Sequence, residues 1–216
     1  MKTTTAVFAI VCAFFLKDVN AQTNSDSTQF KTEYTNLDEA LKNPNQVYRL
    51  NLGNQKINIA DSVWKQFTNL EYLSLKNDHL KQIPKGIGLL KNLKTLDLSG
   101  NDFKILPASF MGLKNLQELY LNDEKNFKLN RNIERLGKLP SLKSLHLEND
   151  NLKILPRNFY RLGRLESLFL NNNSFNKVPI EIKGLRNLKY LDFHDNNYKP
   201  NFNQLENNGF GIKINF

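Results

Sequence analysis

The residues of this chain best suited to chemistry are His146, His194 and the carboxylate side chains near them in the sequence. Asp192 and His194 lie two residues apart and would share one face of a strand. A zinc site needs at least three protein ligands, and the pattern offers no convincing third one. The sequence also has no serine or cysteine at a nucleophile elbow and no glycine-rich phosphate loop. We therefore predict no catalytic residue, no metal and no cofactor, and we expect a binding protein rather than an enzyme.

The elements that position these residues belong to an internal repeat. In "NLKTLDLSGNDFKILPASFMGL", residues 92–113, the apolar period changes within a few residues from that of a strand to a longer one. The same change recurs in seven units, spaced by 23 residues except for one interval of 26. The units start at Val47, Leu70, Leu93, Leu116, Leu142, Leu165 and Leu188. Such regularity predicts a solenoid in which each unit forms one coil.

The repeated frame is L-x-x-L-x-L-x-x-N-x-L, usually followed by x-x-L-P-x-x-F-x-x-L. It resembles the leucine-rich-repeat family, and the Leu-Pro pair is similar to the subgroup of plant disease-resistance proteins and Ras-pathway scaffolds. The resemblance implies an α/β solenoid (horseshoe) of about seven repeats with a parallel concave sheet. It also implies protein binding in general, without naming a partner.

The frame has a physical reason that does not depend on the family. Leu-x-Leu predicts a short strand with one face buried, and the strands of successive coils stack in parallel. A buried amide at the ninth position can satisfy backbone groups of its own turn and of the neighbouring coil. Asn101, Asn173 and Asn196 are the predicted ladder residues. In other units the position holds Gln55, Asp78, Glu124 and Asp150.

The fourth unit departs from the frame. "LNDEKNFKLNRNIERLGKLPSL", residues 121–142, is three residues longer than its neighbours and lacks the Leu-Pro return. Insertions in solenoids gather on one face and often carry function, although solenoids also tolerate them at little cost. Both interpretations remain open.

The outward-facing strand positions predict a binding surface on the concave face. Tyr120, His146 and Phe169 occupy the fifth position of three consecutive units, and Tyr72 and Tyr190 occupy the third position of theirs. Aromatic side chains rimmed by carboxylates are typical of protein-binding hot spots, although the rings could also serve only to stiffen the sheet. The predicted ligand-binding residues are Tyr72, Tyr120, His146, Phe169, Tyr190, Glu118, Asp123, Glu148 and Asp192.

Charge separates between the faces. The whole chain carries +9, yet the outward strand positions hold two cationic and six anionic residues. This predicts a protein partner with a basic patch. The alternative is a glycan- or envelope-binding module that uses the concave aromatics or the basic edge of Lys81, Lys104 and Lys153, which Lys199 extends. That edge could also be merely solvated, and export would disfavour nucleic acid.

The two ends of the chain suggest export and capping. Residues 1–21 combine an early lysine, the apolar run Ala6–Leu16 and a small residue, Ala21, at the expected cut, which is typical of a cleavable signal peptide. The only cysteine, Cys12, lies within it. We expect a mobile leader at 22–34, a helical cap at 35–46, repeats at 47–198 and a C-terminal cap at 199–216. The cleaved product, without a transmembrane segment, would be secreted or periplasmic.

Overall fold

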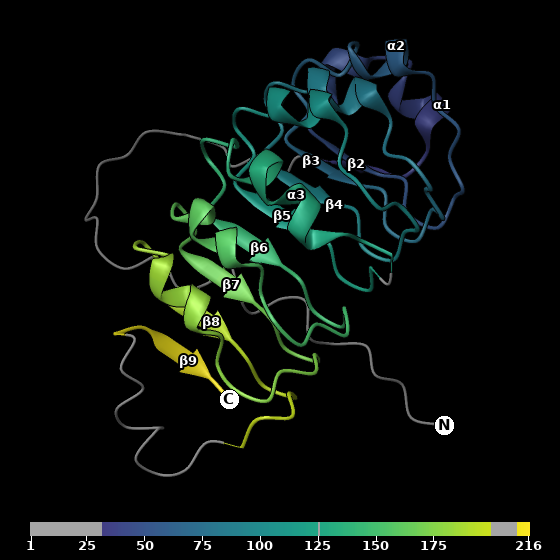
Figure 1. The fold of residues 1–216 in the computed structure, drawn as a ribbon. Helices are drawn as coiled ribbons and strands as arrows, with labels where there is room; N and C mark the ends of the chain where they lie inside the picture. Colours follow the sequence, from purple (N-terminus) through teal and green to yellow (C-terminus); the bar gives the residue numbers. More distant parts are fainter. Residues whose placement is uncertain (1–31, 125, 200–210) are drawn as a thin grey trace, which may run out of the picture. The chain divides into compact units, whose positions relative to one another are not determined.

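The computed structural model describes residues 32–124, 126–199 and 211–216, which belong to one compact unit, Lys31–Phe216. The predicted signal peptide, most of the predicted leader, and residues 200–210 of the C-terminal cap lie outside the described residues. The core of the unit is a sheet of nine parallel strands arranged in chain order (Figure 1). The strands are β1 (Glu33–Tyr34), β2 (Arg49–Asn51), β3 (Tyr72–Ser74), β4 (Thr95–Asp97), β5 (Glu118–Tyr120), β6 (Ser144–His146), β7 (Ser167–Phe169), β8 (Tyr190–Asp192) and β9 (Lys213–Asn215).

The Leu-x-Leu pattern accounts for the register of this sheet. Each strand from β2 to β8 has a leucine at its centre, and these leucines pair directly from coil to coil, as Leu96 does with Leu73 and Leu119. All seven central leucines are fully buried. A one-residue slip would turn them outward, so burial fixes the register. The α/β leucine-rich-repeat solenoid and its seven unit starts are thereby confirmed.

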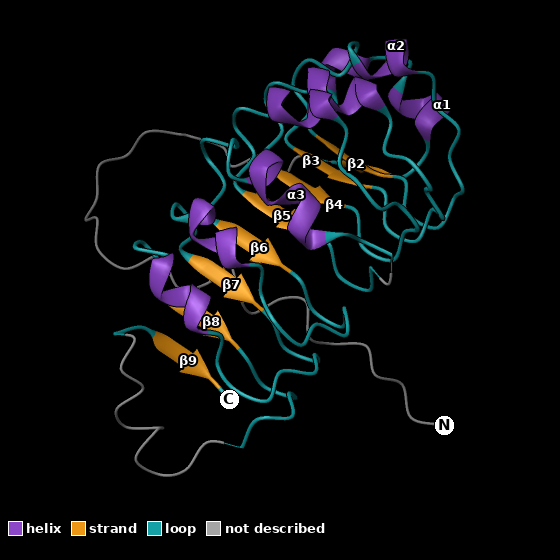
Figure 2. Ribbon diagram, in the orientation of Figure 1, coloured by secondary structure: helices purple, strands orange, loops and turns teal. Residues whose placement is uncertain are grey.

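Short helices return the chain on one side of the sheet (Figure 2). They are α1 (Leu37–Ala40), η2 (Pro44–Gln46), α2 (Asp61–Trp64), η3 (Lys85–Leu89), η4 (Ala108–Gly112), α3 (Leu129–Leu136), η5 (Arg157–Leu162) and η6 (Ile180–Gly184), where η marks a 3₁₀ helix. Four of the 3₁₀ helices start directly after the proline of a Leu-Pro or equivalent pair, because the ring fixes φ near the value that a helix entry requires. Trp64, Phe110 and Phe159 fill the core between the helices and the sheet.

The fourth unit uses its three additional residues to form a longer return. The α-helix α3 takes the place of the 3₁₀ helices η4 and η5 of the neighbouring units and buries Leu129, Ile133 and Leu136. Asn132 is fully buried in the same helix, and its amide accepts from Leu106 N at 2.8 Å and donates to Lys104 O at 3.0 Å. This amide satisfies the backbone of the preceding coil, so the insertion is an integral part of the core.

The asparagine ladder is present at the predicted positions. The buried amide of Asn101 accepts from Leu80 N at 2.9 Å and donates to Leu75 O at 2.9 Å and to Leu98 O at 2.6 Å. Asn173 and Asn196 likewise join backbone groups of two coils. Each amide therefore links a turn to the coil before it, which is the role that the sequence predicted for these residues.

Carboxyl groups replace the amide in three units. Asp78 accepts from Gln55 N at 2.8 Å, Glu124 from Asn101 N at 2.9 Å, and Asp150 from Glu124 N at 2.7 Å. Burial raises the pKa of Glu124 to about 9 and that of Asp150 to about 8. Burial thus favours the neutral form of both carboxyl groups, which accept from the backbone as the ladder asparagines do.

Both ends of the sheet carry additional strands. Asn36, within the segment expected to form a helical cap, caps α1 by accepting from Glu39 N at 3.0 Å. However, assigning Glu33 and Tyr34 to a mobile leader was wrong, since β1 pairs with β2 and Glu33 meets Arg49 at 3.2 Å. Pairing satisfies backbone groups that the first coil would otherwise leave exposed at its edge. At the other end, β9 pairs with β8 and forms part of the expected C-terminal cap.

Candidate binding face

The sheet face opposite the helices, predicted to be concave and here called the open sheet face, carries a continuous row of aromatic rings. Tyr120, His146 and Phe169 are paired residues of β5, β6 and β7. The His146 ring stacks on Tyr120 at a centroid distance of 3.9 Å and on Phe169 at 4.0 Å, with interplanar angles of 19° and 6°. Tyr190 of β8 continues the row at 5.6 Å from Phe169. Four of the predicted residues thus form one rigid strip, which we call the aromatic row.

His146 is the centre of this row and its least accessible member, with 6% of its surface exposed. Its Nδ1 lies 3.2 Å from a Glu148 oxygen, and its Nε2 lies 3.2 Å from a Glu118 oxygen. Burial lowers the pKa of His146, but the bonds to the two carboxylates outweigh burial and raise it above its usual value. The imidazole is thereby held in one orientation between two rings and two acids. It organises the row and offers little surface of its own to a ligand.

The carboxylates of the predicted site surround the row but are largely engaged by it. Although burial raises the pKa of Glu118, the bond to His146 outweighs burial and lowers it below its usual value. Two carboxylates share one imidazole, so this part of the face keeps a net negative charge even when His146 is protonated. Asp192 contacts His194 Nδ1 at 2.5 Å and accepts from the Tyr190 hydroxyl at 3.2 Å.

Asp123 and Tyr72 complete the set of predicted residues. Asp123 is exposed in the turn after β5, at a φ of 61°, and accepts a short hydrogen bond from the Asn149 amide. Tyr72 lies on β3, two strands before Tyr120, and the Arg49 guanidinium covers its ring at 4.0 Å. Asp123 therefore lies in the turn beyond the end of β5, bonded to the next turn, and the structure does not bring Tyr72 into the aromatic row.

The histidines do not form a larger polar site. Among residues 32–124, 126–199 and 211–216, no group of three or more His, Cys, Asp or Glu is arranged to hold a metal ion. Within the same ranges, no helix is long and apolar enough to cross a membrane. The repeat pattern did not predict that Asn215 lies beside His194. The Asn215 amide donates to Asp192 at 3.0 Å and lies 3.2 Å from His194 Nδ1. No repeat period could identify that contact, because β9 lies beyond the last unit.

The predicted basic edge divides into two parts. Lys81, Lys104 and Lys153 are all exposed on the turns after the ladder position. Lys81 and Lys104 line a groove that also includes Lys85 and Arg135, but Lys153 is not among its lining residues. Sequence reasoning missed Lys85 and Arg135 as partners of the edge, because neither recurs at the 23-residue interval that aligns Lys81 with Lys104.

Comparisons with known proteins agree with this geometry. A family model described as "Leucine-rich repeat region" matches residues 46–130. A chain in the Toll–Spatzle complex of Drosophila is similar, with a TM-score of 0.60 and 18% identity, over 69% of this chain and 20% of that chain. Internalin C2 from Listeria monocytogenes is similar, with a TM-score of 0.56 and 25% identity, over 79% of this chain and 72% of that chain.

The extent of these likenesses limits what they imply. The chain spans about one fifth of the length of the Toll–Spatzle complex chain that it resembles. A search of curated protein sequences finds no significant match. The matched region nevertheless includes three complete coils of the sheet, and the same frame continues in register through β8. The repeat frame, the asparagine ladder and these likenesses together show a leucine-rich-repeat solenoid, in which residues 46–130 match the family model.

Proposed function

We propose that the chain is an exported recognition module that binds a protein partner through the open sheet face. The observation that carries the proposal is the aromatic row, in which four side chains from four consecutive strands form one ordered strip. The rings already stack on one another without a partner, so association should cost little additional side-chain entropy. Leucine-rich-repeat proteins in general are protein-interaction modules, and this is the role that the fold supports.

The geometry of the row indicates how a partner would contact it. Because His146 stacks on one ring face of Tyr120 and on one of Phe169, those faces are covered, and a partner would meet the edges of the Tyr120 and Phe169 rings. Ring edges carry a weak positive potential and suit apolar contact better than cation binding. Cationic groups of the partner would instead meet the carboxylates of Glu118, Glu148 and Asp123 beside the row. An apolar segment flanked by Lys or Arg is the complementary surface.

Protein capture with matched variants tests this proposal. The bait is the chain from Gln22 onward, applied to cell-envelope and culture-fluid extracts of the source organism. The variant Tyr120→Ala/Phe169→Ala removes two rings of the row. The control variant Tyr160→Ala removes an exposed ring from η5, away from the open sheet face. All baits are first compared by circular dichroism.

A protein retained by the wild-type and Tyr160→Ala baits but lost by the double variant would support the open sheet face. Crosslinking should then place the basic residues of that protein near Glu118 or Asp123. Equal recovery on all three baits would refute the assignment.

Export is proposed from the N-terminal sequence pattern alone. The expected product begins at Gln22 and is recovered from the periplasm or the culture fluid. N-terminal sequencing of that product tests the cut, and a product that starts at Met1 in the cell pellet would contradict it.

The opposing proposal, a hydrolase, has a simple test. It requires turnover that His194→Ala abolishes, and we expect no turnover with or without this change.

A further inference from the structure

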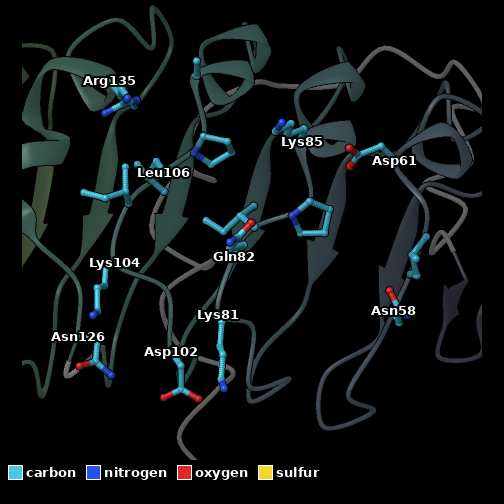
Figure 3. A pocket seen from close by; sticks show the side chains of 16 residues that line it. Asn58, Asp61, Lys81, Gln82, Lys85, Asp102, Lys104, Leu106, Asn126 and Arg135 are labelled. Atoms are coloured by element: carbon cyan, nitrogen blue, oxygen red, sulfur yellow. The ribbon is translucent and has the colours of Figure 1, made fainter.

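A groove of about 1130 Å³ lies away from the open sheet face, along the segments that lead from the ladder turns to the helices (Figure 3). Its lining comes from four consecutive coils, with Asn58 in the first, Gln82 in the second, Pro107 in the third and Arg135 in the fourth. Volumes of about 300–1,000 Å³ are typical of pockets for single small molecules. An open groove of this size suits an elongated ligand that crosses several coils.

The charge of the groove is predominantly positive. Its cationic side chains, called here the groove cations, are Lys81, Lys85, Lys104 and Arg135. Its acids are Asp61, which accepts from Gly86 N at 2.8 Å, and Asp102, which lies 3.7 Å from His79 Nδ1.

No groove cation forms an ion pair with another described residue. In Figure 3, Lys81 and Lys104 lie low in the view, toward the ladder turns, and Lys85 and Arg135 lie high in the view, toward the helices. The positive charge is therefore spread over the groove, and the two acids of the lining reduce it without cancelling it.

The remaining lining distinguishes among anionic ligands. Asn58, Gln82 and Asn126 supply exposed amides that can donate to and accept from hydroxyl groups. The described lining contains no aromatic side chain, whereas single-stranded nucleic acids are generally held by stacking on aromatic rings. A recessed groove also cannot lie against a flat bilayer over its whole length. Spaced cations combined with amides fit a flexible polymer that carries both negative charges and hydroxyls.

We propose that this groove binds an acidic polysaccharide, a glycan chain bearing sulfate or carboxylate groups. The four groove cations pair with its anionic groups, and the amides hydrogen-bond to its hydroxyls. The site is separate from the aromatic row, so one module can hold a protein on the open sheet face and a glycan polymer in the groove. This inference does not depend on the proposed protein partner.

Direct binding measurements on the purified protein test the groove. The probe is fluorescent dextran sulfate at 50 and 150 mM salt, and neutral dextran of equal length is the reference. Anionic phosphatidylglycerol vesicles and a single-stranded oligonucleotide test the two other classes of polyanion. The groove variant is Lys81→Gln/Lys85→Gln/Lys104→Gln/Arg135→Gln. The control variant is Lys114→Gln/Lys138→Gln/Lys153→Gln/Lys177→Gln, which removes the same charge from exposed lysines outside the lining.

We expect dextran sulfate to bind more tightly than the vesicles or the oligonucleotide, and neutral dextran not to bind. The groove variant should weaken binding about 30-fold, because each exposed ion pair contributes roughly a factor of two to three. The control variant should weaken it less than about threefold. The milder variant Lys81→Gln/Lys104→Gln changes only exposed side chains, and its expected loss is about fivefold.

Two results would overturn the proposal. Equal losses in the groove and control variants would mean that binding follows net charge alone. Tighter binding of vesicles or of the oligonucleotide would assign the groove to another class of ligand. If the groove variant does not fold, the Lys81→Gln/Lys104→Gln variant decides between the same outcomes. Capture of a protein partner should be unchanged in this double variant, which keeps a failure here distinct from a failure of the proposed function.

Discussion

Replacing Asn101 with alanine should be among the most damaging changes in the fold. The Asn101 amide accepts from Leu80 N, donates to Leu75 O and Leu98 O, and makes a longer bond to Ser99 O at 3.4 Å; all of these bonds are buried. Alanine would keep the backbone in place but remove every one of these bonds. One backbone N–H and two carbonyls would then lack this partner in the interior, at the turn that joins two coils.

The expected loss follows from these three groups. Each buried polar group left without a partner costs about 1–3 kcal/mol. Entry of water would relieve part of the cost, so we expect the free energy of unfolding to fall by about 3–5 kcal/mol. This is a large fraction of the roughly 5–15 kcal/mol that stabilises a typical domain. The effect should also spread to neighbouring coils, because each coil is stabilised mainly by the coils beside it.

Asn115→Ala is the matched control. Asn115 also donates to a backbone carbonyl of the preceding coil, Lys91 O at 2.9 Å, but its side chain is exposed, so water can replace the bond. Its loss should be under about 1 kcal/mol. Urea unfolding followed by circular dichroism and by tyrosine fluorescence measures both values, and their m-values should match that of the wild type. Equal losses for the two variants, or a loss below about 1 kcal/mol for Asn101→Ala, would refute the ladder argument.

Three further predictions concern packing and protonation. Gly86→Ala should lower the free energy of unfolding, measured by urea titration, by about 2–3 kcal/mol, because the added Cβ would lie 2.3 Å from a backbone oxygen. Gly163→Ala should change it little, because no atom lies nearer than 3.4 Å to the added Cβ. Burial raises the pKa of Glu124 to about 9, whereas the same group in the unfolded chain releases its proton above about pH 4.5. The Tm of the protein should therefore fall as the pH rises from 5 to 9, and Glu124→Gln should make this fall smaller. An NMR titration of His146 should give a pKa above 6.5, and Glu148→Gln should lower that pKa. The stabilisation from protonation of His146 should be complete below pH 6.5 and lost as the pH rises through the folded-state pKa. An unchanged His146 pKa in the Glu148→Gln variant would contradict the contact between the two side chains.

The fold could be predicted from the sequence because the repeat makes each local choice visible several times. A central leucine at every 23-residue step fixes strand, register and direction together, since any slip would expose the whole column. The position of Asn101 in the frame likewise predicts a buried amide, because a sharp turn inside a stack leaves backbone groups that only such a side chain satisfies.

The candidate site was only partly predictable. The sequence aligned Tyr120, His146 and Phe169, because equivalent positions on neighbouring strands must lie side by side. It could not show that the His146 ring would be sandwiched and buried, since ring orientation depends on contacts with Glu118 of β5 and with Glu148, which follows the end of β6. The same limit applies to Tyr72, whose ring the sequence grouped with the others but which Arg49 covers instead.

The sequence by itself determined the solenoid, the order and register of seven strands, the amide ladder and the aromatic column, because all of these follow from periodic positions along one chain. Only the tertiary structure decided which carboxyl groups have their pKa raised by burial, how the rings stack, and that β1 and β9 extend the sheet at its ends. It alone brought Lys85 and Arg135 together with Lys81 and Lys104 in one groove. These features depend on distances between coils and on burial, which a repeat period does not encode.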